Sequence, residues 1–297
     1  MLRDIIKTIR VKQWIKNLFV FGPIVFSKHL FDFVCVKYSI IAFFTFCCLS
    51  SVVYIMNDII DKDIDKLHPE KSKRPIAANR ISVQTAIFLL VIFMVFAICL
   101  ISFIRGYFWL VSVAYLVLNL CYSLFLKHLV ILDVFSLAGC FILRVLSGAI
   151  AIQVVASPWL IICTLFISLF LGFAKRRGEI VTLGTENQNI TRKVLANYDI
   201  PFIDIMLMIT ASGMAISYSL YTVSERTIKE INSENLIYTT VFVLYGIFRY
   251  LYLSMKKNMG EDTAQVLIKD MPLIINILLW VLTCVFILYP GTVFNRI

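Results

Sequence analysis

Charged residues are scarce in this sequence. Asp, Glu, Lys and Arg make up 15% of the 297 residues, whereas about 25% is usual in a soluble globular domain. Hydrophobic residues account for 60%, and the mean hydropathy is +0.89. A soluble domain is therefore excluded, and the composition indicates an integral membrane protein. The net charge of +10 does not indicate nucleic-acid binding, because the basic residues follow a membrane topology.

Several ligand and catalytic patterns are also missing. The eight cysteines lie almost entirely within apolar runs and form no CxxC or Cys/His metal spacing, so we expect small buried hydrophobic residues. His29, His68 and His128 are scattered and predict no metal triad. No Ser/His/Asp arrangement, glycine-rich phosphate loop or haem motif occurs. The basic, amphipathic segment 1–17 has no cleavage site, so we expect it to belong to the mature protein.

Long apolar runs dominate the rest of the chain. About nine segments have the roughly 17–25 residues that a helix needs to cross a bilayer. They lie near 17–34, 36–57, 82–104, 107–126, 131–153, 157–175, 202–223, 236–255 and 271–290. Gly22 and Pro23 interrupt the first, which is the weakest. The predicted fold is an all-α integral membrane protein, a bundle of about nine transmembrane helices that forms one catalytic domain over 1–297.

The distribution of basic residues predicts the orientation. Of the 28 Lys and Arg residues, 20 flank one set of helix ends, six flank the other, and Arg144 and Arg249 lie within spans. Because basic residues concentrate on the cytoplasmic side, we expect a multi-pass protein of the cytoplasmic membrane with its amino terminus inside and its carboxyl terminus outside. The expected cytoplasmic active-site loops are about 58–81, 126–130, 175–201 and 256–270.

A cluster of acidic residues stands at the end of the second apolar segment. If the helix continues, Asp58, Asp61 and Asp65 share one face, with Asn57 beside them. Like charges so placed repel each other and need a cation. Mg²⁺ prefers oxygen ligands and usually takes one or two carboxylates together with substrate phosphates. The cluster therefore predicts a magnesium site that binds a diphosphate.

The loop that follows is basic, with Lys71, Lys73 and Arg74. These cations and the metal together could neutralise phosphate oxygens; the alternative is a basic flank that only follows membrane topology. The pattern Asn57-Asp58-x-x-Asp61-x-x-x-Asp65, followed by Lys73-Arg74-Pro75, resembles the first aspartate-rich motif of the UbiA superfamily of intramembrane prenyltransferases. The resemblance covers essentially the whole chain, and the nine-helix plan agrees with it.

A second aspartate-rich motif follows the sixth helix in the aromatic prenyltransferases of that superfamily. Here the position is basic and reads Lys175-Arg176-Arg177-Gly178-Glu179. The chain instead resembles the branch that transfers 5-phosphoribose from 5-phosphoribosyl-1-diphosphate to a polyprenyl (decaprenyl) phosphate. Further segments resemble that branch: Arg10-Val11-Lys12-Gln13-Trp14-Ile15-Lys16-Asn17, Tyr122-Ser123-x-x-x-Lys127 with Asp133, Leu143-Arg144-x-x-x-Gly148, and Tyr198.

This reaction assembles a diphosphate, a sugar phosphate and an acceptor phosphate, so a second cationic cluster is expected beside the metal. The resemblance implies Mg²⁺ as the cofactor, held by Asn57, Asp58, Asp61 and Asp65. It implies substrate-binding roles for Lys16, Lys71, Lys73, Arg74, Lys127, Arg144, Lys175, Arg176, Arg177 and Tyr198. For Arg144 the alternative is a structural pair with a helix partner, either Asp133 or a backbone carbonyl. For Lys175 to Arg177 the alternative is a basic flank.

The expected partners are a polyprenyl phosphate, phosphoribosyl diphosphate and membrane lipid, with no nucleic acid, and a homo-oligomer is left open. One alternative is a prenyltransferase that moves a prenyl group from a prenyl diphosphate to an aromatic or other small acceptor. A membrane transporter is the third interpretation, because charged residues within spans can mark a translocation path. It is disfavoured because the charges gather at one end of the helices.

Overall fold

The computed structural model describes residues 2–66, 71–183, 195, 197–256, 266 and 269–290. His68 and parts of three predicted loops lie outside the described residues. Every regular element in the described part of the chain is helical, which confirms the predicted all-α membrane bundle.

Seven helices are long and apolar enough to cross a membrane by length and composition. They are α3 (Phe33–Ile60), α5 (Val83–Ser102), α7 (Leu132–Ala151), α8 (Pro158–Leu183), α10 (Ile200–Val223), α12 (Thr240–Lys256, extended by η5, Asn235–Thr239) and α14 (Met271–Leu288). The apolar helix α6 (Phe108–Leu124) is shorter. Each of these eight coincides with a predicted segment. The short elements are α1 (Leu2–Thr8), η1 (Val11–Phe21), α2 (Gly22–Phe26), α4 (Lys62–Lys66), η2 (Lys71–Lys73), η3 (Leu126–His128) and α11 (Glu225–Ile231).

The first predicted segment, 17–34, does not form one continuous helix. The chain forms the 3₁₀-helix η1, then the five-residue helix α2, and then a loop that leads to Asp32. Pro23 has no backbone N–H and starts the new helix at Gly22. Lys28 then takes a left-handed backbone (φ 60°), which prevents the helix from continuing.

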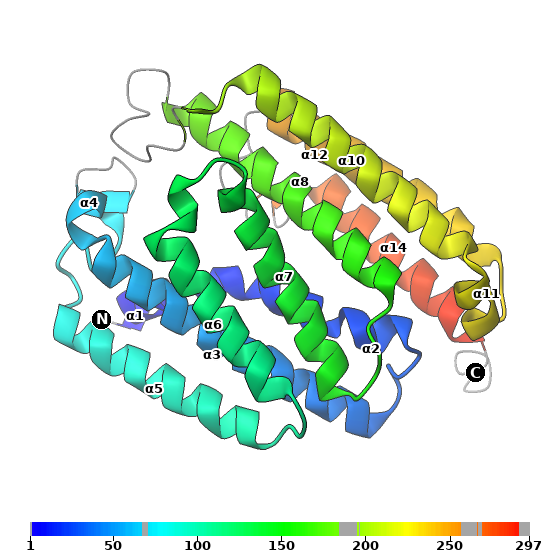
Figure 1. Ribbon diagram of the computed structural model, residues 1–297, viewed down its shortest axis with the longest axis horizontal. Coiled ribbons are helices and arrows are strands. Elements are labelled where there is room, and N and C mark those ends of the chain that lie inside the picture. Colours follow the sequence, from blue (N-terminus) through cyan, green and yellow to red (C-terminus); the bar gives the residue numbers. More distant parts are fainter. Residues whose placement is uncertain are drawn as a thin grey trace.

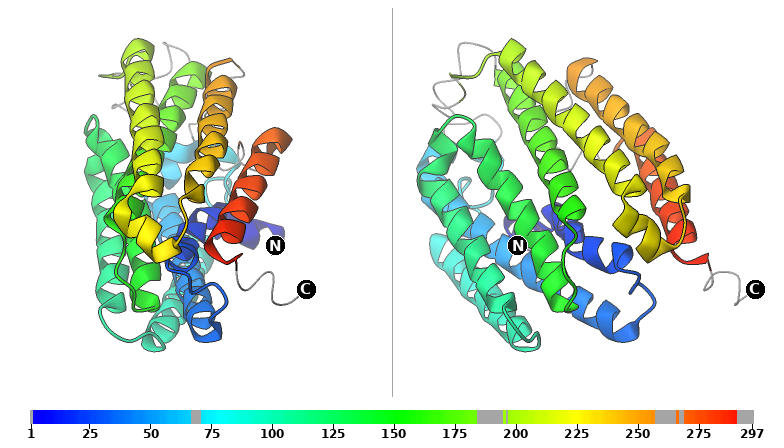
Figure 2. Two further views of the ribbon diagram at one scale, coloured as in Figure 1. Left: turned by 90° about the vertical axis from the view of Figure 1, so that its right-hand side faces the viewer. Right: turned by 45° about the vertical axis from the view of Figure 1, so that its right-hand side comes forward.

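The long helices run roughly alongside one another (Figure 1). Helix α3 packs against α5, α7 packs against both α6 and α8, α8 packs against α10, and α12 packs against α14 (Figure 2). The most apolar window of α3 is 61% buried, whereas that of α5 is only 11% buried although it is more hydrophobic. Helix α3 therefore belongs to the protein interior, and α5 presents its apolar side chains to the lipid.

Segment η1 reaches the bundle interior and packs between α3 and α7. The close approach depends on Gly148 of α7, because a Cβ there would lie 1.9 Å from the carbonyl oxygen of Val20. Small residues allow such backbone contacts between helices in membranes. Gly148 thus sets the position of η1 and of the polar residues Lys16 and Asn17 that it carries.

Candidate active site

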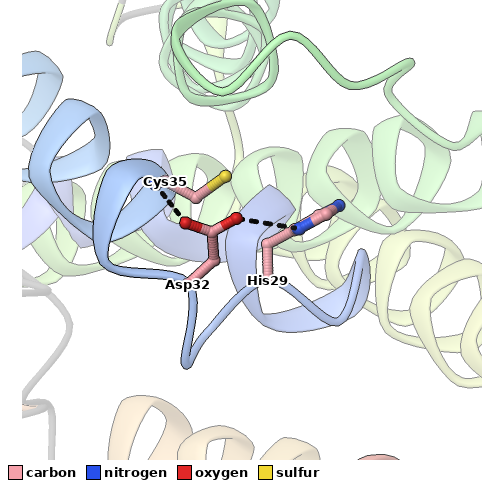
Figure 3. Close-up of side chains that lie close together, drawn as sticks. All are labelled: His29, Asp32 and Cys35. Carbon is pink, nitrogen blue, oxygen red and sulfur yellow. Dashed lines mark hydrogen bonds and ion pairs between the residues drawn. The ribbon is translucent and has the colours of Figure 1, made fainter.

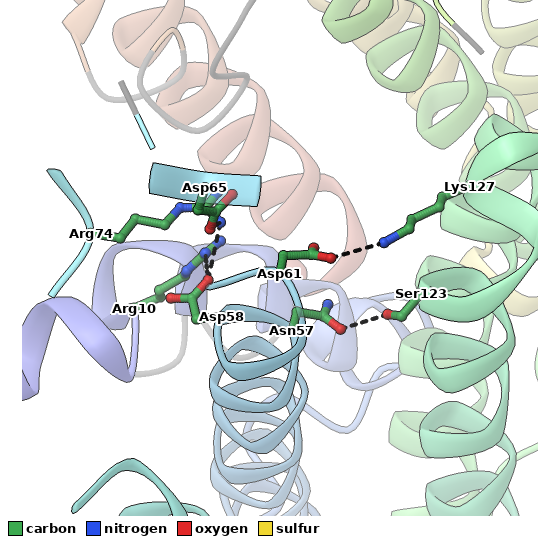
Figure 4. Close-up of polar contacts among 8 residues, drawn as sticks. All are labelled: Arg10, Asn57, Asp58, Asp61, Asp65, Arg74, Ser123 and Lys127. Carbon is green, nitrogen blue, oxygen red and sulfur yellow. Dashed lines mark hydrogen bonds and ion pairs between the residues drawn. The ribbon is translucent and has the colours of Figure 1, made fainter. Parts of the chain in front are cut away.

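The acidic cluster lies where α3 ends. The helix stops at Ile60, Asp61 follows it, and Asp65 stands on the separate short helix α4. The three aspartates therefore do not share one continuous helix, which was the condition for placing them on one face. Asp58 and Asp65 nevertheless meet, because Nη1 of Arg74 lies 3.1 Å from Oδ1 of Asp58 and 2.6 Å from Oδ2 of Asp65 (Figure 4). Both carboxylates are buried.

Arg10 is the site residue that sequence reasoning missed. Its guanidinium donates a hydrogen bond to Oδ1 of Asp58 and lies over the ring of Tyr54, 4.7 Å from the centroid. Arg10 takes a left-handed backbone (φ 53°) at the junction of α1 and η1, which turns the chain there. In the sequence it begins the segment Arg10–Asn17 that resembles the phosphoribose-transferring branch, but it was given no role in the site, because its partner lies 48 positions further along the chain.

The other side of the cluster faces α6 and η3. Nζ of Lys127 lies 3.2 Å from Oδ1 of Asp61, and the hydroxyl of Ser123 donates to Oδ1 of Asn57 at 2.6 Å (Figure 4). The predicted site residues Asn57, Asp61 and Lys127 are therefore brought together, although 66 residues separate Asn57 from Ser123 and Asp61 from Lys127.

The buried loop after η2 holds Arg74 in place. Pro75 accepts hydrogen bonds at its carbonyl from the N–H groups of Arg80 and Ile81. Ile76 is fully buried in an apolar cluster with Ile55 and Ile81. This packing anchors the predicted basic loop to α3, with Lys71 and Lys73 on η2 next to Arg74.

The donor set suits a divalent cation in part. Carboxylate and amide oxygens are the ligands that Mg²⁺ prefers, and one or two carboxylates are usual. Asp58 and Asp65 already share a single positive group, Arg74, so a cation can be held between them. Among the described residues, no three of the carboxylates bring ligand oxygens within 4.8 Å of one another. The residues present therefore fit a cation held by Asp58 and Asp65, with Asp61 and Asn57 on the adjoining side.

Arg144 lies deep in the bundle, on α7. Its Nε donates to Oδ1 of Asn17 at 2.7 Å, Nη1 to the carbonyl of Cys140 at 2.9 Å, and Nη2 to the hydroxyl of Tyr115 at 2.8 Å. These three partners are uncharged. The structural alternative of a pair with a backbone carbonyl is thus present, whereas the pair with Asp133 is not, because Asp133 binds Arg176.

Polar side chains on α6 connect this region with the acidic cluster. Tyr115, Asn119 and Ser123 follow at four-residue intervals on one face, and each of them is buried. Ser123 contacts Asn57 and Tyr115 contacts Arg144. Eight residues of helix correspond to about 12 Å. A polar stripe therefore runs from the acidic cluster into the bundle and ends at a guanidinium.

Arg176 belongs to a buried ion-pair network and not to an open phosphate site. It has no solvent exposure, and its Nε lies 2.5 Å from Oδ2 of Asp133. Its Nη1 donates to Glu179, and its Nη2 lies 3.3 Å from the hydroxyl of Tyr122. All three guanidinium nitrogens are engaged, so the structure gives Arg176 a role in joining α6, α7 and α8.

Tyr198 extends this network to the start of α7. Its hydroxyl donates to Oδ1 of Asp133 at 2.8 Å and accepts from the N–H of Ile131 at 2.6 Å. Burial raises the pKa of Tyr198 above its ordinary value, so the hydroxyl keeps its proton. Ile131 has φ 69°, which is strained for a β-branched residue, and forms the centre of a γ-turn. Tyr198 thus holds the turn that follows Lys127.

The two remaining residues of the basic triplet also contact carboxylates. Nε of Arg177 lies 2.7 Å from Asp204 on α10, and its Nη1 donates to the carbonyl of Ser254 on α12 at 3.1 Å. Nζ of Lys175 lies 3.9 Å from Glu179 and is about one-third exposed. Lys175 is therefore the member of the triplet whose side chain is most accessible.

Comparisons with known proteins agree with this arrangement. The model of the UbiA prenyltransferase family matches residues 19–180. The chain is 27% identical to the decaprenyl-phosphate phosphoribosyltransferase of Mycolicibacterium smegmatis over 291 residues, which cover 95% of this chain and 91% of that protein. It is 31% identical to the protein of the same name from Corynebacterium glutamicum over 220 residues, 73% of this chain and 66% of the other. A solved structure of a UbiA homolog from Archaeoglobus fulgidus, bound to GPP and Mg²⁺, has the same fold, with a TM-score of 0.71 at 15% identity over 96% of this chain and 99% of that one.

Proposed function

This chain belongs to the UbiA prenyltransferase family, and on that basis we propose that it transfers 5-phosphoribose from 5-phosphoribosyl-1-diphosphate to a polyprenyl phosphate and releases diphosphate. Two relatives that align with most of the chain carry the name decaprenyl-phosphate phosphoribosyltransferase. The single observation that supports a diphosphate site most strongly is the pair of buried carboxylates, Asp58 and Asp65, that share one cation at the end of a membrane-spanning helix.

The balance of charges in the cluster favours binding of the donor and the metal together. The carboxylates of Asp58, Asp61 and Asp65 are matched by Arg10, Arg74 and Lys127. This set is neutral, so a divalent cation alone would add uncompensated positive charge. The diphosphate of the donor supplies the matching negative charge. Mg²⁺ bound by the aspartates would neutralise charge that develops on the departing diphosphate.

The basic residues have separate roles in this proposal. Arg10, Arg74 and Lys127 exchange their carboxylate partners for phosphate oxygens when the donor binds. Lys71 and Lys73 stand on η2, which packs against α4, the helix of Asp65. Arg144, with its uncharged partners, and Lys16 on η1 remain candidates for another phosphate group, as does Lys175.

Arg176, Arg177 and Tyr198 act as positioning residues in this proposal. Their polar atoms hold α7, α8, α10 and the turn at Ile131 together. The turn follows η3, which carries Lys127. The role of Arg176, Arg177 and Tyr198 is therefore to fix the frame around the substrates.

At the reacting atoms, an oxygen of the acceptor phosphate attacks C1 of the ribose while the bond from C1 to the diphosphate oxygen breaks. The acceptor is already an anion, so no general base has to remove a proton. The chain contributes positioning of the two substrates and electrostatic stabilisation of the departing diphosphate, and the second is usually the largest single term in enzyme catalysis. The excess of Lys and Arg at this end of the helices supports an orientation with the site toward the cytoplasm.

A pair of aspartate variants tests the site. The double substitution Asp58→Asn and Asp61→Asn should abolish diphosphate release, because it removes two carboxylates of the cluster. Asp63→Asn is the matched control, since Asp63 lies on α4 but is exposed and paired with Lys66. Diphosphate release from phosphoribosyl diphosphate is measured in detergent-solubilised protein, together with elution on a sizing column as a check of folding. Full turnover by the folded double variant would contradict the proposal.

A further inference from the structure

Three side chains with metal-binding atoms meet at the opposite end of α3 from the acidic cluster. His29, Asp32 and Cys35 bring one nitrogen, one oxygen and one sulfur within 4.8 Å of one another (Figure 3). Helix α3 has 28 residues, or about 42 Å at 1.5 Å per residue, so this group is separate from the candidate active site. Sequence reasoning missed it, because the spacing is not one of the common Cys/His patterns.

The loop that carries His29 and Asp32 is held in place before any ligand binds. Nζ of Lys28 donates to the carbonyl of Ile231 at 3.1 Å, and the N–H of Leu30 donates to the hydroxyl of Tyr289 at 3.1 Å. The N–H of Asp32 also donates to the carbonyl of His29 at 3.0 Å. These bonds fix the loop from both sides, which lowers the entropic cost of bringing the ligands together.

The two oxygens of Asp32 have different surroundings. Oδ1 accepts the N–H groups of Val34 at 2.8 Å and Cys35 at 3.3 Å, and so caps α3. These bonds lower the pKa of Asp32, with the bond from Cys35 as the largest cause, and keep the carboxylate charged. Oδ2 faces Nδ1 of His29 at 3.9 Å. Figure 3 shows the carboxylate between the imidazole and Cys35, so the second oxygen is placed for a shared ligand.

We infer that His29, Asp32 and Cys35 form a binding site for a Zn²⁺-type divalent cation. An imidazole, a carboxylate and a thiolate are the ligand types that zinc takes, and three protein ligands leave a fourth position for water. On binding, Cys35 releases its thiol proton to solvent, and the neutral imidazole and the carboxylate contribute lone pairs. The ion would join the loop after α2 to the first turn of α3.

Cobalt absorption tests the site directly, since Co²⁺ replaces Zn²⁺ and gives a charge-transfer band only when a thiolate is a ligand. The full chain in detergent is titrated with Co²⁺, and Zn²⁺ is then added as the competitor. We expect a saturable band at one equivalent that Zn²⁺ removes. Cys35→Ser should abolish the band, and His29→Ala should weaken binding by at least about tenfold, as even the loss of an outer-shell partner costs about 10–100-fold.

Two further variants separate metal binding from folding and from the active site. Asp32→Asn keeps a good helix cap but removes the charged ligand, so the fold should remain while affinity falls. Cys99→Ser removes an exposed cysteine elsewhere and should leave the band unchanged. A band that persists in Cys35→Ser, equal affinity in His29→Ala, or only non-saturating binding to the folded wild type would overturn the inference. The readout does not depend on the proposed transferase activity.

Discussion

Removing Arg176 tests whether the basic triplet is a structural network. In Arg176→Met the side chain keeps much of its volume, but Asp133 loses its cation while it remains fully buried. Glu179 loses its closest partner as well. Removing one member of a buried ion pair costs about 3–5 kcal/mol, a large share of the roughly 5–15 kcal/mol that stabilises a typical protein. Arg176→Lys should recover only part, because an ammonium lacks the fork that reaches Asp133, Glu179 and Tyr122 together.

Thermal unfolding in detergent is the assay. An unfolding entropy of about 2.1 cal/mol/K per residue gives about 1.6 °C per kcal/mol for 297 residues, so Arg176→Met should lower the Tm by about 5–8 °C. Lys175→Met is the matched control on the same turn of α8. Its Nζ is 3.9 Å from Glu179 and partly exposed, so its loss should change stability by less than about 1 kcal/mol. Adding Asp133→Asn to Arg176→Met should restore part of the Tm, since the unpaired buried charge is gone. Equal Tm values for Arg176→Met and Lys175→Met would refute the reasoning.

Three other predictions address the site and its frame. Tyr198→Phe should lower both the Tm and the rate of diphosphate release, because the N–H of Ile131 and the carboxylate of Asp133 each lose a hydrogen-bond partner. Leaving such a buried group unsatisfied costs about 1–3 kcal/mol. An unchanged Tm together with an unchanged rate would count against the positioning role. Chelation of divalent cations should stop diphosphate release and added Mg²⁺ should restore it, whereas full activity in excess chelator would refute the metal. The hydrogen bond from Arg249 lowers the pKa of Asp270. This pair therefore stabilises the fold fully at pH values above the ordinary pKa of the carboxyl. The stabilisation is lost as the pH falls through the lowered pKa. Wild-type protein should therefore lose more Tm than Asp270→Asn between pH 7 and pH 3, and parallel losses would contradict this.

Hydrophobic patterning predicted the long helices because burial in lipid requires continuous apolar runs. The first segment was the exception, since Gly22 and Pro23 break it and the polar residue Asn17 is satisfied inside the bundle by Cys47, Ser50 and Arg144. The acidic motif could be found from local spacing. Of its cations, Arg74 follows closely in the chain, and Lys127, 66 residues from Asp61, was predicted only through the resemblance to the family.

Pairs that are distant in the sequence were not predictable from one chain. Arg10 reaches Asp58 across 48 residues, and Arg176 reaches Asp133 across 43. A basic triplet at a helix end has the same sequence whether it flanks a membrane, binds phosphate or pairs with buried acids. Only the packing of α7 against α8 distinguishes these, and here it places Arg176 out of solvent.

The most direct measurement follows the sugar. Purified protein is given Mg²⁺, a polyprenyl phosphate and phosphoribosyl diphosphate labelled in the ribose, and the lipid extract is then counted. The proposed function predicts label in the lipid that depends on the acceptor, on Mg²⁺ and on an intact acidic cluster. The contradicting result has two parts: the lipid stays unlabelled, and the same preparation releases diphosphate from a prenyl diphosphate. That result would exclude phosphoribosyl transfer and leave prenyl transfer as the activity of this chain.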